Sequence, residues 1–318
     1  MTEVPLPSGE RSPPLGGGSA RSTRPHASPA DYAEERARLR GLRTLASDVV
    51  FAGPLGWLLR RRAVRWLLTS GYRSGLIAFG ERNDYRIPPR WVTVDLFGAD
   101  FNLDVRTGQG LPFADGSQRV VYTSHTIEHL DDQALAALLA EFARVLGASG
   151  HVRIETPDAE RITQAYLGDD ERFFAYFERE NRASLVQGLG LSPAYAERHN
   201  ALIGLFSCYL ERGHHVGVLA PREEVERRLR DGDLESFGAW CVSLQTAEQR
   251  ASGGHVNVLY FDKLRRMLIE AGFRDVRRME NGVTQIPRLS LRWIERPGPR
   301  AGYSLYLEAT AQGLASRA

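Results

Sequence analysis

The chain has 318 residues, of which 42% are hydrophobic, so it is long enough to bury the core of one large domain or of one domain with insertions. Its 41 basic and 39 acidic residues give a formal net charge of +2, a balance that disfavours nucleic acid as a partner. Two cysteines, Cys208 and Cys241, are too few for a disulfide framework and lack metal-type spacing. They suit a reducing compartment, and we expect a cytoplasmic protein.

The N-terminal region divides into two parts. Residues 1–30 are rich in Pro, Gly, Ser and Arg without the apolar run of a secretion signal, which predicts a disordered tail. Residues 31–70 are helical in pattern and predict a helical cap, in which arginines lie among Trp and Leu: Arg60, Arg61, Arg62 and Arg65. We favour a lid that packs its apolar face on the next domain. The alternative is a helix that contacts a membrane surface or a partner.

Residues 71–318 are predicted to form one α/β domain. The apolar run from Leu76 to Gly80 predicts the first strand, and Trp91 to Leu96 predicts the second, with Asp95 at its carboxyl end. Open parallel sheets bind ligands at the carboxyl ends of their strands. Further along, RVVYTS predicts another strand, Asp131 to Leu146 an amphipathic helix, and HVRIETP a further strand. This alternation of strands and helices is typical of a parallel α/β sheet.

Several short motifs occur here in a fixed order: W-x-x-V-D from Trp91, Asp104, L-P-F-x-D from Leu111, S-H-x-x-E-H-L from Ser124 and R-V-L-x-x-x-G from Arg144. Together they resemble the class I S-adenosylmethionine-dependent methyltransferases, in particular the small-molecule group of type 11. A second block, formed by His255 and the segments 264–273 and 304–310, resembles the last helix and final hairpin of that family. The resemblance implies a Rossmann-like fold with a mostly parallel seven-stranded sheet, helices on both faces, and S-adenosylmethionine as cofactor.

The resemblance also implies a set of cofactor-binding residues: Gly80, Glu81, Asp95, Leu96, Asp104, Val105, Ser124 and His125. Asp95 is expected to accept hydrogen bonds from both ribose hydroxyls, its alternative role being to cap a loop. Asp104 and Val105 are expected to flank the adenine, unless Asp104 only forms a turn.

The first loop departs from the family, because it has a single glycine, Gly80, where a G-x-G turn is usual. Glu81 is expected either to bind the ammonium group of the cofactor or to be a solvated loop residue.

Residues 159–254 are more numerous than a minimal connection needs, and we expect this insertion to cover the sheet edge and choose the substrate. Methyl transfer requires alignment of the acceptor and, for a hydroxyl or amine, removal of a proton. The predicted catalytic residues are His255, His215 and His125, with His214 as a further candidate base and Tyr209 and Tyr260 as positioning groups. His255 comes first because the resemblance places a histidine just before the last helix.

His125, Glu128 and His129 also spell the H-x-x-E-H pattern of inverse zinc peptidases, in which two histidines on one helical face bind a metal and Glu178 or Glu180 could complete the site. The preceding strand and the L-P-F-x-D phrase have no role in that pattern. We therefore predict no bound metal and rank a zinc hydrolase last.

The sequence thus predicts a methyltransferase that acts on the oxygen or nitrogen of a small molecule, in specialised metabolism, with S-adenosylmethionine and the acceptor as partners and no nucleic acid. A homodimer stays open. The alternative is a protein of the same fold without methyl transfer, either a repurposed cyclase or hydrolase or a non-catalytic scaffold, which the missing glycine turn favours.

Overall fold

The computed structural model describes residues 73–82, 87–291, 294–295 and 298–313, together with residues 64, 66 and 67. The predicted disordered tail and nearly all of the predicted N-terminal cap lie outside these residues. Both stay predictions from the sequence.

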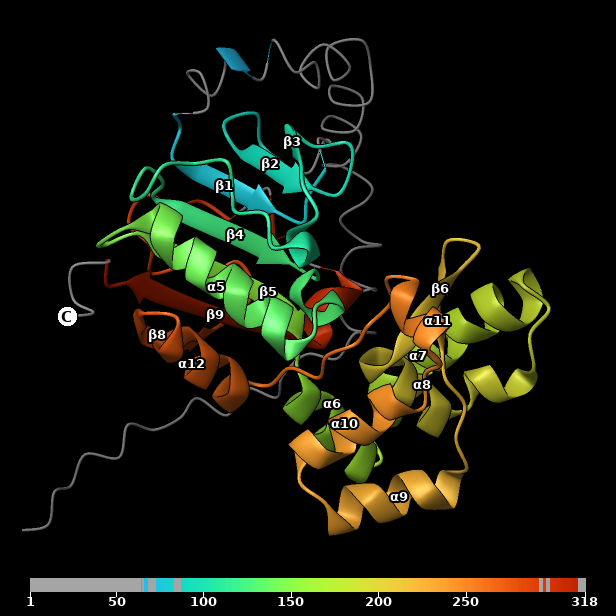
Figure 1. The fold of residues 1–318 in the computed structure, drawn as a ribbon. Coiled ribbons are helices and arrows are strands. Elements are labelled where there is room, and N and C mark those ends of the chain that lie inside the picture. Colours follow the sequence, from blue (N-terminus) through green and yellow to red (C-terminus); the bar gives the residue numbers. More distant parts are fainter. Residues whose placement is uncertain are drawn as a thin grey trace, which may run out of the picture.

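A single seven-stranded sheet forms the centre of the molecule, in the order β3-β2-β1-β4-β5-β9-β8 (Figure 1). Its strands are β1 (Leu76–Phe79), β2 (Val92–Asp95), β3 (Phe101–Asn102), β4 (Val120–Ser124), β5 (His151–Pro157), β8 (Phe273–Met279) and β9 (Ser304–Ala311). Five neighbouring strands pair in parallel, in the order β3, β2, β1, β4 and β5, whereas β9 runs antiparallel to both β5 and β8. This arrangement confirms the predicted fold class.

Two helices, α5 (Asp132–Leu146) and α12 (Phe261–Glu270), pack next to each other on one face of the sheet (Figure 1). Helix α5 begins where Asp131 accepts a hydrogen bond from the backbone N–H of Ala134, and it buries the stripe predicted from its spacing: Leu135, Leu138, Leu139, Phe142 and Leu146. On the opposite face, Ala78 and Tyr122 pack with Ile87, Ile286 and Leu291. The sheet is therefore buried on both faces, as parallel sheets are.

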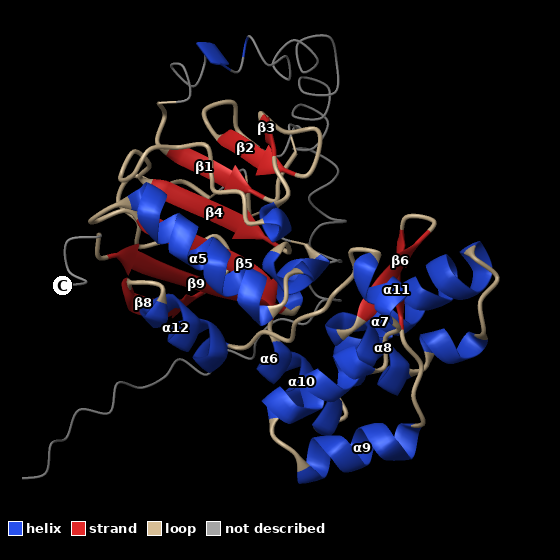
Figure 2. Ribbon diagram, in the orientation of Figure 1, coloured by secondary structure: helices blue, strands red, loops and turns tan. Residues whose placement is uncertain are grey.

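Between β5 and α12 the chain builds a second lobe of helices around one hairpin (Figure 2). Its elements are α6 (Ala159–Leu167), α7 (Glu171–Asn181), the π-helix η3 (Arg182–Gly188), η4 (Pro193–Ala196), α8 (Arg198–Phe206), β6 (Cys208–Glu211), β7 (His214–Gly217), α9 (Arg222–Asp231), α10 (Leu234–Ser243) and α11 (Ala247–Ala251). The lobe has a core of its own, centred on Phe173, Phe174, Phe206 and Phe237.

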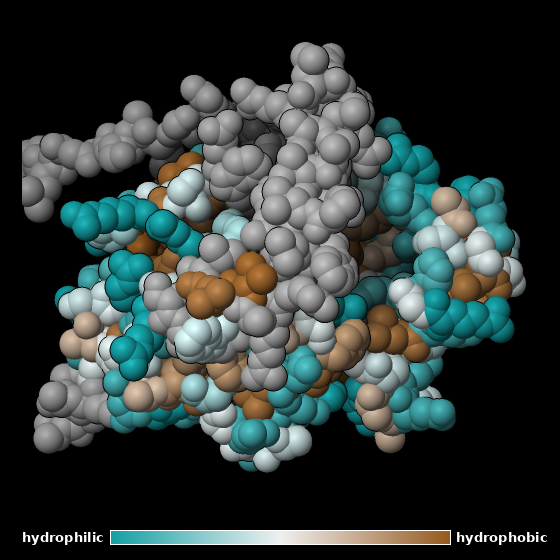
Figure 3. All heavy atoms as spheres, turned by 90° about the horizontal axis from the view of Figure 1, so that it is seen from above, coloured by the Kyte–Doolittle hydropathy of each residue, from teal (hydrophilic) through white to brown (hydrophobic). Residues whose placement is uncertain are grey.

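Three short 3₁₀ turns complete the described structure: η1 (Val105–Thr107), η2 (Ile127–His129) and η5 (Pro299–Gly302). Seen from above in Figure 3, hydrophobic side chains reach the surface in separate patches among hydrophilic ones. No helix in the described part of the chain has the length and apolar character needed to cross a bilayer.

Candidate active site

Asp95 ends strand β2, as predicted, and its side chain stays partly accessible. One carboxylate oxygen accepts the backbone N–H of Leu96 at 2.7 Å, and the other lies 3.4 Å from Nε of Arg82. Leu96 and Phe97 follow with 48% and 54% of their surface exposed, which is unusual for apolar residues at a sheet edge. Because a carboxylate has about four acceptor positions, Asp95 can still accept from ribose hydroxyls, with the two apolar side chains beside it. A nucleoside site at these residues stays a prediction from the sequence.

Gly80 ends β1 with φ at +74°, and its backbone N–H donates to the carbonyl oxygen of Val94 at 2.7 Å. A Cβ added to Gly80 would lie 2.0 Å from Oγ1 of Thr126, so only glycine fits against this threonine. Thr126 therefore packs on a residue that the resemblance assigns to the cofactor site. Glu81 comes next in the chain. The pKa of Tyr122 is raised mainly by burial, then by the charges of Glu155 and Glu295, and then by the charge of Glu81.

Asp104 caps the 3₁₀ turn η1, and its carboxylate is hydrogen-bonded to a residue of that turn. Its carboxylate accepts hydrogen bonds from the backbone N–H of Arg106 at 3.0 Å and from the guanidinium at 2.9 and 2.8 Å. The side-chain hydrogen bond from Arg106 lowers the pKa of Asp104, although burial opposes it. Val105 packs against the main core. An adenine contact by this carboxylate stays a prediction and requires that the ligand share it with Arg106.

The residues after β4 form a bend and a 3₁₀ turn rather than the helix that the zinc-peptidase alternative needs. His125 has a φ of +46°, and η2 covers only Ile127–His129, so His125 and His129 do not share a helical face. The two nitrogens of His125 lie 3.2 Å from Oε1 of Glu128 and 2.8 Å from Oγ of Ser304.

The proposed third ligands of that alternative are occupied elsewhere, since Glu178 binds Arg198 at 2.9 Å and Glu180 binds Arg179 at 3.4 Å. The H-x-x-E-H arrangement predicted for a zinc hydrolase is therefore not formed.

A pocket of about 230 Å³ lies between the end of the sheet and the helical lobe. Its polar lining consists chiefly of His125, Glu128, His129, His215, His255 and Tyr303. The structure thus brings the three predicted catalytic histidines together, and Ser124 lies next to them with its Oγ donating to Glu155 at 2.9 Å.

The residues that line the pocket differ in part from those predicted from the sequence. His129 and Tyr303 line the pocket but were not predicted as catalytic. His214, Tyr209 and Tyr260 are not among its lining residues, and Tyr260 instead donates to Glu235 at 3.3 Å.

Burial sets the charge state of this pocket. It lowers the pKa of His215 to about 4 and that of His255 to about 3, so both imidazoles are neutral near pH 7. Burial alone would raise the pKa of Glu128, but the hydrogen bond from His125 and the charges of nearby histidines bring it below its ordinary value. The pocket therefore places a buried carboxylate near the neutral imidazoles of His215 and His255.

Two of the sequence motifs have a structural explanation. The guanidinium of Arg144 donates to the backbone oxygens of Phe113 at 2.8 Å and Leu111 at 3.0 Å and to the carboxylate of Asp115 at 2.7 Å. Glu141 also binds Arg144 and accepts the backbone N–H of Leu111. The L-P-F-x-D and R-V-L phrases thus hold the loop before β4 to helix α5.

A mostly parallel sheet, a carboxylate at the end of its second strand and a polar pocket at the same edge are features with which open α/β sheets bind nucleotide-type ligands. Residues 92–154, which run from β2 into β5, match the family model described as a methyltransferase domain. This match supports the resemblance to the class I S-adenosylmethionine-dependent methyltransferases seen in the sequence and leaves the acceptor undefined.

Solved structures with similar folds are distant. The chain is 12% identical to a methyltransferase of Archaeoglobus fulgidus, with a TM-score of 0.32 and coverage of 84% of this chain and 99% of that one. It is 13% identical to a possible histamine N-methyltransferase of Thermotoga maritima, with a TM-score of 0.33 and coverage of 80% and 91%. Phosphoethanolamine N-methyltransferase 2 of Haemonchus contortus, solved with S-adenosyl-L-methionine, is 11% identical, with a TM-score of 0.31 and coverage of 74% and 48%. No curated protein matches the chain in sequence.

Proposed function

We propose that the protein transfers the methyl group of S-adenosylmethionine to an oxygen or nitrogen of a small molecule bound in the histidine-lined pocket. The observation that carries this proposal is the position of the pocket. The pocket lies at the carboxyl end of β4, on the same sheet edge as Asp95. In the sheet, only β1 lies between β4 and β2, the strand that ends with Asp95. A cofactor with its ribose on Asp95 and its sulfonium near Ser124 and His125 would direct its methyl group into the pocket.

The pocket residues have distinct parts in this mechanism. Methyl transfer is a displacement at carbon, so the main task is to hold the acceptor in line with the sulfonium. His125 is held by Glu128 and Ser304 and packs edge-on against Tyr303, with the ring centroids 5.6 Å apart, so it forms a rigid wall of the pocket. His255 and His215 have accessible lone pairs but low basicity, as their lowered pKa values imply. They orient the acceptor and accept only an acidic proton.

The helical lobe is proposed to select the acceptor, as the sequence predicts for residues 159–254. Phe177 and Leu185, from α7 and η3, supply apolar walls opposite the polar residues. A volume of about 230 Å³ suits an acceptor of about one ring rather than a polymer. A role in specialised metabolism, a cytoplasmic location and a homodimer remain parts of the sequence-based proposal.

Replacement of Asp95 by alanine is expected to weaken S-adenosylmethionine binding by at least about 100-fold, because two hydrogen bonds to a charged acceptor contribute roughly 3 kcal/mol together. Calorimetric titration of the purified full chain with S-adenosylmethionine and S-adenosylhomocysteine measures this loss. The matched control is Asp231→Ala, which removes an exposed aspartate at the end of α9 and should leave the affinity unchanged.

The same titration separates the alternatives. Micromolar binding that disappears in Asp95→Ala supports the methyltransferase. Absence of binding in the folded wild-type protein would favour a non-catalytic or repurposed member of the fold, for which the packing of Thr126 on Gly80 is the structural argument. Binding without transfer to any acceptor would point to a repurposed enzyme.

A further inference from the structure

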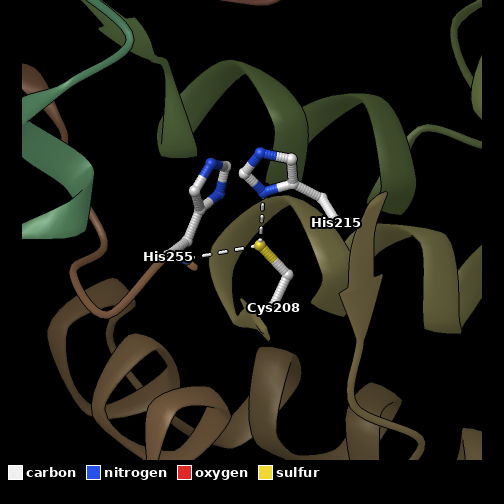
Figure 4. A group of neighbouring side chains, drawn as sticks. All are labelled: Cys208, His215 and His255. Carbon is white, nitrogen blue, oxygen red and sulfur yellow. Dashed lines mark hydrogen bonds between the residues drawn. The ribbon is translucent and has the colours of Figure 1, made fainter. Parts of the chain in front are cut away.

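Three imidazole rings form a compact triangle in the pocket. The ring centroids of His129 and His255 lie 4.9 Å apart, those of His215 and His255 5.3 Å, and those of His129 and His215 5.8 Å. They come from three separate segments: the turn η2, strand β7 and the chain before α12. Figure 4 shows the rings of His215 and His255 next to each other, with the sulfur of Cys208 beside them. Such convergence of imidazoles from distant segments is what a metal site requires.

The hydrogen bonds of two of these rings fix which nitrogen is free. Nδ1 of His129 lies 2.9 and 3.1 Å from the carbonyl oxygens of Gly253 and Gly254, and Nδ1 of His255 lies 2.9 Å from that of Leu205. A carbonyl oxygen can only accept, so Nδ1 carries a proton in both rings, and Nε2 is the nitrogen with the lone pair in the neutral form of each ring. Metal-binding histidines have this same arrangement, in which a backbone carbonyl orients the ring and sets its tautomer.

A carboxylate completes the group. Oε1 of Glu128 lies 4.0 Å from Nε2 of His255, and the ligand atoms of Glu128, His129 and His255 all lie within 4.8 Å of one another. Tetrahedral ligands with bonds of about 2.1 Å are about 3.4 Å apart, so a small movement of side chains brings these atoms to bonding distance. The other carboxylate oxygen of Glu128, Oε2, accepts a hydrogen bond from Thr156 at 3.2 Å, which helps to fix the orientation of the carboxylate.

The charge balance points the same way. The side chain of Glu128 is only 3% exposed, and burial of a carboxylate is costly unless a cation compensates it. A divalent cation would compensate the carboxylate and use the imidazole lone pairs.

We propose that Glu128, His129 and His255 bind one divalent transition-metal ion, with at least one coordination position open to the pocket. Two histidines and one carboxylate are the ligand set of catalytic zinc and of non-haem iron(II) sites. His125, whose Nδ1 lies 3.2 Å from Oε1 of Glu128, orients the carboxylate from outside the ligand set. The pairing of His129 with His255 replaces the local H-x-x-E-H ligand set considered from the sequence.

The open position gives the metal a role that rests on the proposed function. An acceptor hydroxyl or amine in the pocket can bind there, and the metal then lowers the pKa of that group. His255 would then act through the metal, and His215 would orient the acceptor. The existence of the site does not depend on this role.

The test measures metal content and affinity rather than activity. The full-length protein is stripped with a chelator, titrated with Zn²⁺ alone and analysed for bound metal, and Co²⁺ is used as a spectroscopic probe. We expect one equivalent of tightly bound metal. His255→Ala, His129→Ala and Glu128→Gln should each weaken binding by on the order of 100-fold or more. His214→Ala removes a neighbouring histidine of β7 that does not line the pocket and should keep the full equivalent.

Circular dichroism checks that each variant is folded, and His129→Gln replaces His129→Ala if the alanine variant is not. Three results would overturn the proposal: no stoichiometric metal in the folded wild type, full binding in the His129 and His255 variants, or loss in Cys208→Ser, His215→Ala and His255→Ala with full binding in the Glu128 and His129 variants. The last would assign the ion to the second group of ligand atoms, formed by Cys208, His215 and His255. Titration of the same samples with S-adenosylmethionine separates failure of the metal site from failure of the methyltransferase function.

Discussion

Replacement of Arg153 by alanine is expected to lower the free energy of unfolding by about 3–5 kcal/mol, the usual cost of removing one partner from a buried ion pair. Arg153 lies in the middle of β5, and its side chain is fully buried. Its guanidinium donates to both carboxylate oxygens of Glu295 at 2.7 Å and also contacts Glu308 at 3.4 Å. Without it, two carboxylates remain inside the protein with no cation between them.

Urea denaturation followed by circular dichroism measures this effect. The control is Arg179→Ala, since Arg179 is 66% exposed and pairs with Glu180 at 3.4 Å, and this change should cost no more than about 0.5 kcal/mol. The double variant Arg153→Met with Glu295→Leu should recover part of the loss, because it removes both charges together. A loss below about 1 kcal/mol in Arg153→Ala would contradict the described ion pair.

Replacement of Gly254 by alanine is expected to be the most damaging single methyl addition near the pocket. The new Cβ would lie 1.9 Å from the carbonyl oxygen of Cys208 and 2.7 Å from Cα of Tyr209, and backbone atoms cannot turn aside. Strand β6 and the segment that carries His255 must separate, and the carbonyl of Gly254 must move away from His129. Overpacking of this kind costs about 1–3 kcal/mol or more.

The change should also loosen the histidine cluster, which chemical shifts of the imidazole protons report by NMR. Gly204→Ala serves as the stability control: Gly204 lies inside helix α8, and its added Cβ would be 3.5 Å from Gly217, an ordinary contact. That variant should be neutral or more stable by up to about 1 kcal/mol, because alanine favours helices. Equal stability of the two variants would argue against the close contact at Gly254.

Local pattern was enough to predict most of the sheet. β1, β2, β4, β5 and α5 were predicted within a few residues of their observed bounds, because short apolar runs and helical spacing are local signals. The ion pair of Arg153 was not predictable, because Glu295 is distant in sequence and β5 looks like an ordinary mixed strand.

The site was predicted in part. His125 follows an expected strand, His215 lies in the expected insertion and His255 matches a histidine of the family, and all three line one pocket. His129 entered only through the H-x-x-E-H pattern, which assumes a helix, but the bend at His125, whose backbone N–H donates to the carbonyl oxygen of Glu155 at 2.9 Å, redirects the chain. A triangle built from three segments has no local sequence signal, so its geometry required the fold.

The most direct test of the account is a crystal structure of the full chain with S-adenosylhomocysteine. We predict the ribose hydroxyls on the carboxylate of Asp95, the adenine against Leu96 and Phe97, and the sulfur next to Ser124 and His125, facing the histidine-lined pocket. A saturated crystal in which the ligand lies away from Asp95, or in which its sulfur faces away from the pocket, would contradict the proposed active site.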